Sequence, residues 1–434
     1  MTDPSLLASR AMAAPLLQQF AVYSAFAVTI GIALGGPRIG RVRVPGPGLT
    51  AAAAVGALLA LGVLSAHDLV RAGSILWRAI ATIASIMILS AAAQRLGVLD
   101  WLAGLVARRS ANPSAIALYG RIYLLAMVSA AVLNNDTTIL LVTPLVIGLV
   151  RRRYPTRPDL VLPFVFSVFM AAGVAPFMVS NPMNMLVASA AGIGFNEYAL
   201  AMIPVAVASW LVSFLMLCAL FARQLADAPE PVFEPAPPSQ PSAAQLRFLA
   251  LLLAVLGAYP LVAWLDGPVW AVALLGAATA VLLLRREGIA SGSILREGVA
   301  WETLAFLVGV FLLGMAMEDV GVVQKLAVLY EDAGVFTIGS IAAVGSALMN
   351  NHPTAILNTL ALGGEHADKL DILAALVGGD LGPRLLPTGS LAGLIWVALL
   401  RAHGVRVTTL QFLGVGIVVL IPSLLAALAV LHVP

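Results

Sequence analysis

Four groups of polar side chains stand inside long apolar stretches of this sequence, where a polar group costs free energy unless it finds a hydrogen-bond partner. The groups span residues 134–138, 180–184, 350–354 and 378–390. Asn amides and Ser or Thr hydroxyls both donate and accept hydrogen bonds, so together they can hold a small polar solute or an ion. The alternative is that these residues only cap helix ends and join neighbouring helices.

Broken helices would bring the four groups to one place. Pro182 removes a backbone donor and must interrupt its helix, and the Gly and Pro residues of 378–390 have the same effect. Free backbone N–H and C=O groups at such breaks add donors and acceptors to a common cavity. The side chains expected to bind a ligand there are Asn134, Asn135, Thr137, Thr138, Ser180, Asn181, Asn184, Asn350, Asn351, Thr354, Thr388, Gly389 and Ser390.

Three titratable side chains in the same groups are candidates for proton coupling: Asp136, His352 and Asp380. Burial of Asp136 at a loop tip would favour its protonated form, although a permanently charged helix N-cap is the alternative. Asp136 aligns with His352, so we hypothesise that the two share a proton. Asp380 and Arg384 are four residues apart, a spacing that favours a structural ion pair.

The elements that position these residues must be membrane-spanning helices. Of the 434 residues 61% are apolar, only 24 are Lys or Arg and 21 are Asp or Glu, and the mean hydropathy is +1.00. Such a composition excludes a soluble domain and predicts an all-α polytopic membrane protein with about ten transmembrane helices and two re-entrant hairpins. The predicted spans are 16–36, 49–66, 76–94, 160–192, 198–222, 246–265, 269–284, 301–318, 371–400 and 409–431.

A Pro-rich segment at 223–245 divides the chain into halves that resemble each other, and it is predicted to be a cytoplasmic linker. The first half, 1–222, would contain a hairpin at 113–150 and a broken helix at 160–192. The second half, 246–434, would contain a hairpin at 335–364 and a broken helix at 371–400. The positive-inside rule then places most Arg and Lys in the cytoplasm and both termini outside, so the halves are predicted to be inverted repeats, as in secondary transporters.

Other functional classes lack support in the sequence. There is no nucleotide-binding Gly-rich loop followed by Lys-Ser/Thr and no His-Glu-x-x-His motif, so we expect neither an enzyme nor a bound cofactor or metal. A single cysteine, Cys218, excludes an internal disulfide and a Cys-rich metal site. The Arg residues lie in short loops without interleaved aromatics, which argues against a nucleic-acid partner. We also find no removable signal peptide.

Several motifs resemble the ArsB family of arsenite efflux pumps within the ArsB/NhaD ion transporter superfamily. They are Asn-Asp-Thr-Thr-Ile-Leu-Leu-Val-Thr-Pro, Ser-Asn-Pro-Met-Asn, Asn-Asn-His-Pro-Thr and the run from Asp380 to Ala392, the last being the most family-specific. The resemblance extends from about residue 77 to the C-terminus. The sequence departs from the family pattern at His352, where Met is expected, at Thr137, where Gly is common, and at Gly379, where Cys is sometimes found.

The resemblance implies a multi-pass protein of the bacterial inner membrane that exports arsenite and antimonite, as neutral trihydroxides, in exchange for protons. It also implies, for some relatives, a cytoplasmic arsenite-stimulated ATPase subunit as a partner. Amides and hydroxyls can hold a neutral triol, whereas thiolates would bind arsenic too tightly for release. A sodium/proton antiporter and a sodium-coupled carboxylate carrier are the alternatives, the carrier being disfavoured by Asp136 and Asp380.

Overall fold

The computed structural model describes residues 15–35, 38–39, 42–43, 46–108, 114–232, 240–290 and 292–433. In the first half of the chain the helices are α2 (Leu16–Gly35), α3 (Pro47–Ala60), α4 (Ala66–Arg95), α5 (Val98–Arg108), α6 (Ala115–Val132), α7 (Asn135–Arg153), α8 (Val161–Ala171), α9 (Pro182–Ala190), α10 (Phe195–Leu220) and α11 (Ala222–Ala226). Two short strands, β1 (Arg38–Ile39) and β2 (Val42–Arg43), pair antiparallel between α2 and α3.

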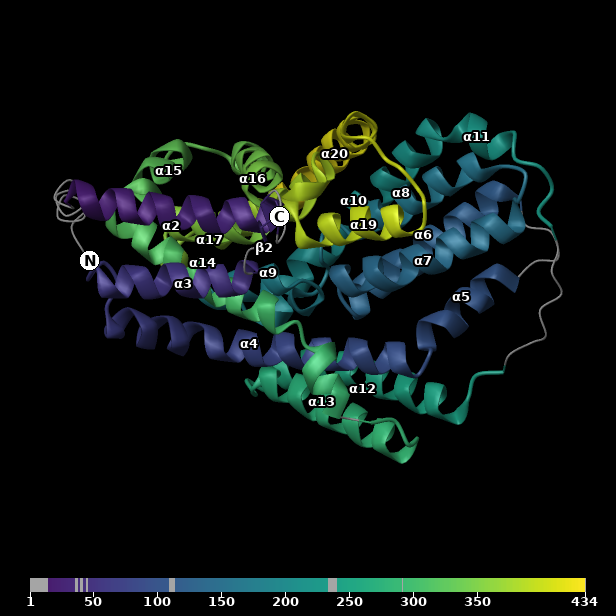
Figure 1. Ribbon diagram of the computed structural model, residues 1–434, viewed down its shortest axis with the longest axis horizontal. Helices are drawn as coiled ribbons and strands as arrows, with labels where there is room; N and C mark the ends of the chain where they lie inside the picture. The colour runs from purple at the N-terminus through teal and green to yellow at the C-terminus, as the bar shows by residue number, and fades with distance from the viewer. Residues whose placement is uncertain are drawn as a thin grey trace.

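The second half of the chain continues from α12 to α20 (Figure 1). Its helices are α12 (Ala243–Trp264), α13 (Val269–Arg286), α14 (Trp301–Asp319), α15 (Val322–Tyr330), α16 (Val335–Met349), α17 (Asn351–Leu362), α18 (Lys369–Leu381), α19 (Leu391–Ala402) and α20 (Thr409–His432). Short 3₁₀ turns are η1 (Pro158–Leu160), η2 (Met178–Ser180), η4 (Gly364–His366), η5 (Gly382–Arg384) and η6 (Pro387–Gly389), and η3 (Ile294–Gly298) is a π-helix.

Apolar helices long enough to cross a membrane dominate the described part of the chain. Eight helices qualify by length and composition, and α3, α8, α16 and α19 belong to shorter apolar segments. Large apolar side chains point outward where lipid would cover them; Leu200, Leu253 and Leu275 are about 70% exposed or more. The predicted all-α polytopic membrane fold is confirmed.

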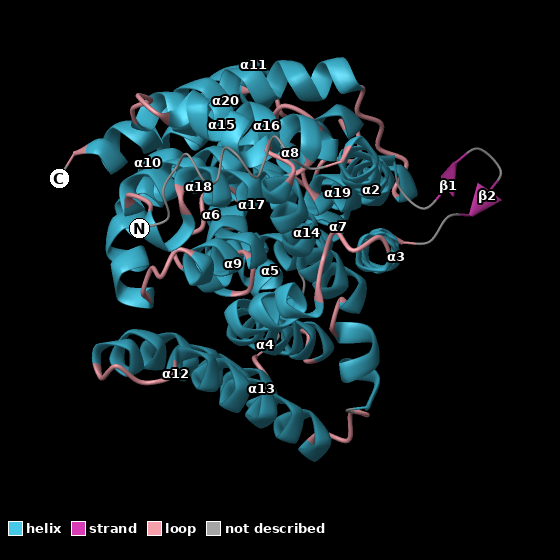
Figure 2. Cartoon of the chain, turned by 90° about the vertical axis from the view of Figure 1, so that its left-hand side faces the viewer, coloured by secondary structure: helices cyan, strands magenta, loops and turns pink. Residues whose placement is uncertain are grey.

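Helices of the two halves pack against each other in a reciprocal pattern. α3 of the first half lies on α14 of the second, and α13 of the second half lies on α4 of the first. Figure 2 shows α12 and α13 as a separate layer beneath α4. α10 and α20 also pack together. The inverted orientation of the halves in the membrane stays a prediction.

Two helix pairs turn sharply at an asparagine. α6 is followed by α7 after Leu133 and Asn134, and α16 is followed by α17 after Asn350 alone. Both asparagines have positive φ angles, 156° and 84°. Their side chains cap the helix that follows: Asn134 Oδ1 accepts from the N–H of Thr137 at 2.7 Å, and Asn350 Oδ1 accepts from the N–H of His352 at 3.3 Å.

Glycines let α18 lie directly on α16. A Cβ added to Gly378 would overlap the carbonyl oxygen of Gly339, and one added to Gly382 would overlap that of Ala343. Gly378 of α18 and Gly382, which directly follows that helix, are four residues apart and so lie on one face, as in the small-residue contacts of membrane helices. The close approach fixes Asp380, which lies between these glycines in the sequence, relative to α16.

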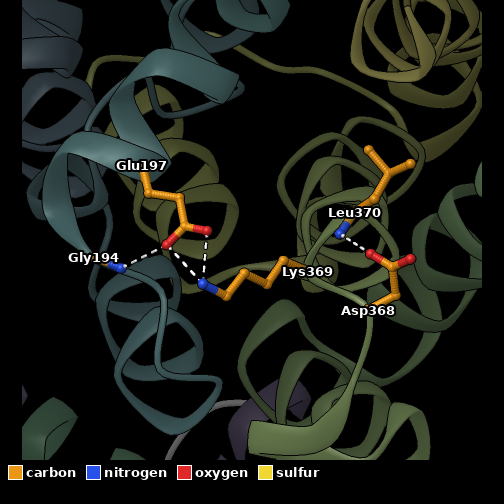
Figure 3. A network of polar contacts seen from close by, with 5 residues as sticks. All are labelled: Gly194, Glu197, Asp368, Lys369 and Leu370. Carbon is orange, nitrogen blue, oxygen red and sulfur yellow. Dashed lines mark hydrogen bonds and ion pairs between the residues drawn. The ribbon is translucent and has the colours of Figure 1, made fainter. Parts of the chain in front are cut away.

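An ion pair joins the beginning of α18 to the beginning of α10 (Figure 3). Lys369 Nζ lies 2.7 Å from Glu197 Oε1, and Glu197 also accepts from the N–H of Gly194 at 3.3 Å. Asp368 caps α18 by accepting from the N–H of Leu370 at 2.9 Å. Both paired side chains are about half exposed, 50% and 45%, so the pair contributes at most about 1 kcal/mol.

Some predicted boundaries are wrong. The span expected at 76–94 begins at Ala66, because Ser65 and Asp68 form a capping box. The span expected at 49–66 ends at Ala60, and the chain turns at Gly62, whose φ is 68°. Short helices α5 and α15 occupy segments for which no helix was predicted. Residues 233–239 of the predicted linker lie outside the described residues.

Candidate functional site

The helix breaks surround a small cavity. Its polar lining comes from both halves: Asn135, Asp136, Asn181, Asn351, His352, Asp380, Arg384 and Ser390. Its apolar lining is Ile139, Phe169, Ala172, Pro383, Leu391 and Ala392. The volume is about 30 Å³, which is room for one or two water molecules. Residues from each of the four polar groups therefore meet at one place.

Asp380 of the second half is held by residues of the first half. Asp380 is buried, with only 8% of the residue exposed. Oδ1 accepts from Asn181 Nδ2 at 2.7 Å, and Oδ2 accepts from Asn184 Nδ2 at 2.8 Å and from the N–H of Ala175 at 3.2 Å. Asn184 also donates to the Tyr198 hydroxyl at 2.7 Å. The break between α8 and α9 and the first turn of α9 supply these donors, so neutral N–H groups hold the buried carboxylate.

Arg384 is buried beside the cavity and is 2% exposed. Its Nη1 donates to the hydroxyls of Ser213 and Ser423 at 2.9 and 2.7 Å, and its Nη2 donates to the carbonyl of Met170 at 2.6 Å. Among the described residues no ion pair joins Arg384 to Asp380. The expected direct ion pair is wrong, because amide and backbone N–H groups occupy the acceptors of Asp380, whereas Nη1 and Nη2 of Arg384 donate to hydroxyls and a carbonyl.

The first turns of α7 and α17 carry matching side chains into the cavity lining. Asn135 and Asp136 come from α7, and Asn135 Nδ2 donates to the carbonyl of Gly173 at 3.2 Å. Asn351 and His352 come from α17. Asp136 and His352 line the same cavity, and within the described part of the chain no hydrogen bond or ion pair joins them.

Two buried acceptors in the cavity lining have no partner within the described residues. His352 Nδ1 lies 3.1 Å from Asn350 Oδ1, and because an amide oxygen only accepts, Nδ1 carries the proton. His352 Nε2 is then an acceptor in the neutral ring, and it is unpartnered, as is Asn351 Oδ1. A polar ligand in the cavity can satisfy such groups.

Other predicted ligand residues lie outside the cavity lining. Ser180 donates to the carbonyl of Ala131 at 2.6 Å, and Thr354 donates to the carbonyl of Asn350 at 2.8 Å. Asn184 contacts Asp380 from behind the cavity, and Asn134 and Asn350 cap helices as described above. The remaining members of this set are Thr137, Thr138, Thr388 and Gly389. Direct contact of these residues with a substrate stays a prediction.

Some residues that build the site were not predicted. Ser213 and Ser423 hold Arg384, and Tyr198 supports Asn184. Each is a polar side chain on a long apolar helix, α10 or α20, and that isolation was the signal available in the sequence. No cluster of three or more His, Cys, Asp or Glu side chains in the described ranges is arranged to hold a metal ion.

Comparison with known proteins agrees with this architecture. Residues 46–434 match the family model of ArsB, described as arsenical pump membrane protein. An arsenical pump membrane protein of Escherichia coli is 32% identical over 89% of this chain and 94% of its own length. Another from Escherichia coli is 31% identical over 94% of this chain and 96% of its own length.

A solved structure shares the fold. The YdaH transporter of Alcanivorax borkumensis aligns with a TM-score of 0.56 over 96% of this chain and 97% of its own, at 15% sequence identity. The family match, which covers most of the chain, is consistent with the apolar helices of the structure. The chain belongs to the arsenical pump membrane protein family and is a multi-pass transporter of the bacterial inner membrane.

Proposed function

We propose that this chain exports arsenite and antimonite, as neutral trihydroxides, in exchange for protons. The observation that carries the proposal is the buried carboxylate of Asp380. It is held by Asn181, Asn184 and the N–H of Ala175, and it shares a cavity with Asp136 and His352. Titratable groups at membrane depth mark proton routes in transporters. The names of the relatives, arsenical pump membrane proteins, support the substrate.

The cavity lining suits a neutral triol. Each hydroxyl of such a substrate donates one hydrogen bond, and Asn351 Oδ1 and His352 Nε2 are acceptors without partners among the described residues. The Asn135 amide and the Ser390 hydroxyl line the same space. A neutral substrate does not require a charged counterpart in the site.

Competition between substrate and proton would couple the two movements. The present cavity of about 30 Å³ is too small for a trihydroxide, so the structure corresponds to a closed site that must open to bind. In the proposed cycle the trihydroxide enters from the cytoplasm, displaces a proton from Asp380 or Asp136, and leaves outside, where a proton replaces it. Movement of one group of helices against another would alternate access to the site.

The alternatives fit the site less well. A sodium ion needs oxygen acceptors, whereas Asp380 is surrounded by N–H donors and the buried guanidinium of Arg384 lies in the same lining. A carboxylate substrate would be repelled by Asp136 and Asp380. A cytoplasmic ATPase subunit stays a predicted partner, for which the acidic, Pro-rich segment 227–241 of the linker is a candidate contact.

Proton release on binding tests the proposal. Antimonite added to purified protein in weakly buffered detergent solution is expected to acidify the solution, which a pH-sensitive dye reports. Asp380→Asn should abolish most of that release. Asp371→Asn is the matched control, because Asp371 lies on the same helix α18 and does not line the cavity. Equal release by the Asp380→Asn variant and the wild type would contradict the proposed coupling.

A further inference from the structure

A larger cavity of about 440 Å³ lies on the other side of the segment that holds Asp380. Met178 of η2 and Met185 of α9 line this larger cavity, whereas Asn181, between them in the sequence, lines the site cavity. The segment 178–185 therefore lies between the two cavities. Only about one helical turn of chain lies on either side of Asn181. The larger cavity is big enough for a trihydroxide, unlike the closed site.

The other walls of the larger cavity come from three places. α4 contributes Arg78 and Thr82, the turn between α9 and α10 contributes Gly194, and the turn between α12 and α13 contributes Asp266. Under the topology predicted from the positive-inside rule, both of these turns and the first half of α4 face the outside. The cavity therefore lies where a substrate released outward from the site would pass.

Arg78 is an exposed residue on the long apolar helix α4, and positive charges are rare within such helices and normally pair or face a wet cavity. Its Cζ lies 5.4 Å from the centre of the Trp77 ring, a cation–π contact. Among the described residues no carboxylate lies within ion-pairing distance of Arg78. Asp266 also lines the cavity and is exposed as Arg78 is, so the wall carries one carboxylate as well as the guanidinium.

The corresponding residue of the second half behaves differently. Trp77-Arg78 aligns with Trp301-Glu302 in the two halves. Glu302 Oε2 accepts from the N–H of Gly48 at 2.8 Å, so this carboxylate binds the beginning of α3. Of these two aligned residues, only Arg78 places a positive charge at an open cavity. A charge at the mouth of a pathway selects by electrostatics which solutes enter it.

We propose that the larger cavity is the exit vestibule for the neutral trihydroxide and that Arg78 makes it selective against cations. This inference rests on the proposed function and deepens it. A neutral triol passes the guanidinium without electrostatic cost, whereas a sodium ion is repelled. Arg78 is therefore a specificity-determining residue that distinguishes metalloid export from sodium exchange.

Charge-selective thiol labelling tests the selectivity assigned to Arg78 without any transport measurement. Ser189 lines the cavity, so Ser189→Cys is introduced together with Cys218→Ser, which removes the one native cysteine. Two membrane-impermeant methanethiosulfonates, one anionic and one cationic, are added outside to intact cells. Relative to a free thiol in solution, the anionic reagent should be favoured by about tenfold. Val269→Cys, at another wall of the cavity, provides a second reporter.

The variants of Arg78 decide the outcome. Arg78→Lys should keep the preference for the anionic reagent, and Arg78→Glu should reverse it. Arg71→Glu is the matched control, because Arg71 is exposed on α4 as Arg78 is but does not line the cavity. Unchanged labelling ratios in Arg78→Glu, or no labelling from outside at either reporter, would overturn the inference.

A transport readout separates the inference from the proposed function. In reconstituted vesicles, arsenite transport by wild type and Arg71→Glu should be insensitive to sodium, whereas Arg78→Glu should be inhibited by it. Arsenite transport by Arg78→Glu that is insensitive to sodium would overturn the selectivity assigned to Arg78. A wild type that shows the labelling preference but does not transport arsenite would overturn the proposed function and, with it, the assignment of the vestibule to a trihydroxide.

Discussion

At the scale of single residues, the two buried charges of the site are insulated from each other by neutral groups. Asp380 is held by amide and backbone N–H donors, and Arg384 by two serine hydroxyls and a carbonyl. A direct ion pair would lock both charges in place, whereas neutral partners leave the carboxylate able to gain or lose a proton. The insulation is therefore what the proposed exchange requires.

Asn184 is expected to matter for stability as well as transport. Asn184→Ala removes one donor from Asp380 and leaves the Tyr198 hydroxyl without that contact, so the free energy of unfolding should fall by about 1–3 kcal/mol. Thermal unfolding in detergent measures the change. Asn196→Ala is the control, because Asn196 makes a single exposed hydrogen bond to the carbonyl of Pro260. Equal effects of the two substitutions would contradict the role given to Asn184.

His352 should shape the dependence of transport on pH. Its Nε2 is buried in the cavity lining without a partner among the described residues, so it can accept a proton or a substrate hydroxyl. His352→Ala is expected to change the profile of arsenite transport against pH, whereas His403→Ala, far along the chain on a half-buried turn, should not. A profile of His352→Ala that superimposes on that of the wild type would remove the imidazole from the proton route.

At the scale of elements, helix breaks and one close helix contact position the site. The breaks at Asn134 and Asn350 bring the first turns of α7 and α17 to the cavity, and the break between α8 and α9 brings Asn181. Gly378 and Gly382 set how closely α18 approaches α16. Small displacements of these elements would separate Asp380 from its donors.

Substitution of Gly378 tests the contact between α18 and α16. Gly378→Ala places a methyl group against the carbonyl of Gly339, and overpacking of this kind costs about 1–3 kcal/mol. Gly73→Ala on α4 is the matched control, since its Cβ would meet nothing within 4 Å, and it should be neutral or stabilising by up to about 1 kcal/mol. Thermal unfolding of both variants is the measurement. A Gly378→Ala variant as stable as Gly73→Ala would show that α18 does not depend on this contact.

The sequence predicts the elements well where composition alone decides. Apolar stretches identify the membrane helices, and the rare Asn-Asn pairs coincide with the sharp turns at Asn134 and Asn350. Helix boundaries depend on local caps instead. Because Ser65 forms a capping box, α4 begins ten residues before the expected position. Helices α5 and α15 were not predicted because each, with 11 and 9 residues, is too short for a membrane span.

At the scale of the whole molecule, the two halves are held together by packing between their helices. α3 packs on α14, α4 on α13 and α10 on α20, and each pair joins one helix from each half. The site is divided in the same way, with Asn181 from the first half bound to Asp380 from the second. Neither half alone can form the site.

Separate expression of the halves tests this dependence. Because the contacts are between helices, residues 1–236 and 237–434 expressed together from two genes should associate and transport arsenite. Either fragment alone should be inactive. Purification of one tagged fragment, followed by detection of the other, measures association. Co-expressed fragments that do not copurify would contradict the view that helix packing, rather than the covalent linker, joins the halves.

The sequence does not predict how segments on the two sides of the linker meet. Similar motifs at Asn134 and Asn350 predict a repetition, whereas the pairing of α3 with α14 depends on surface shapes that no motif records. The same limit applies to Asp380: its spacing from Arg384 favoured an ion pair, and only the tertiary structure shows that the amides of Asn181 and Asn184 take that place.

Transport in everted membrane vesicles tests the central claim most directly. Uptake of labelled arsenite is measured with an imposed pH gradient, with an imposed sodium gradient and with neither, for the wild type, Asp380→Asn and Asp371→Asn. We predict that a proton gradient, acid inside, drives uptake by the wild type and Asp371→Asn, that a sodium gradient does not, and that Asp380→Asn reduces uptake to the level of vesicles without the protein. Uptake driven by sodium alone, or uptake by Asp380→Asn equal to that of the wild type, would contradict proton-coupled export through this site.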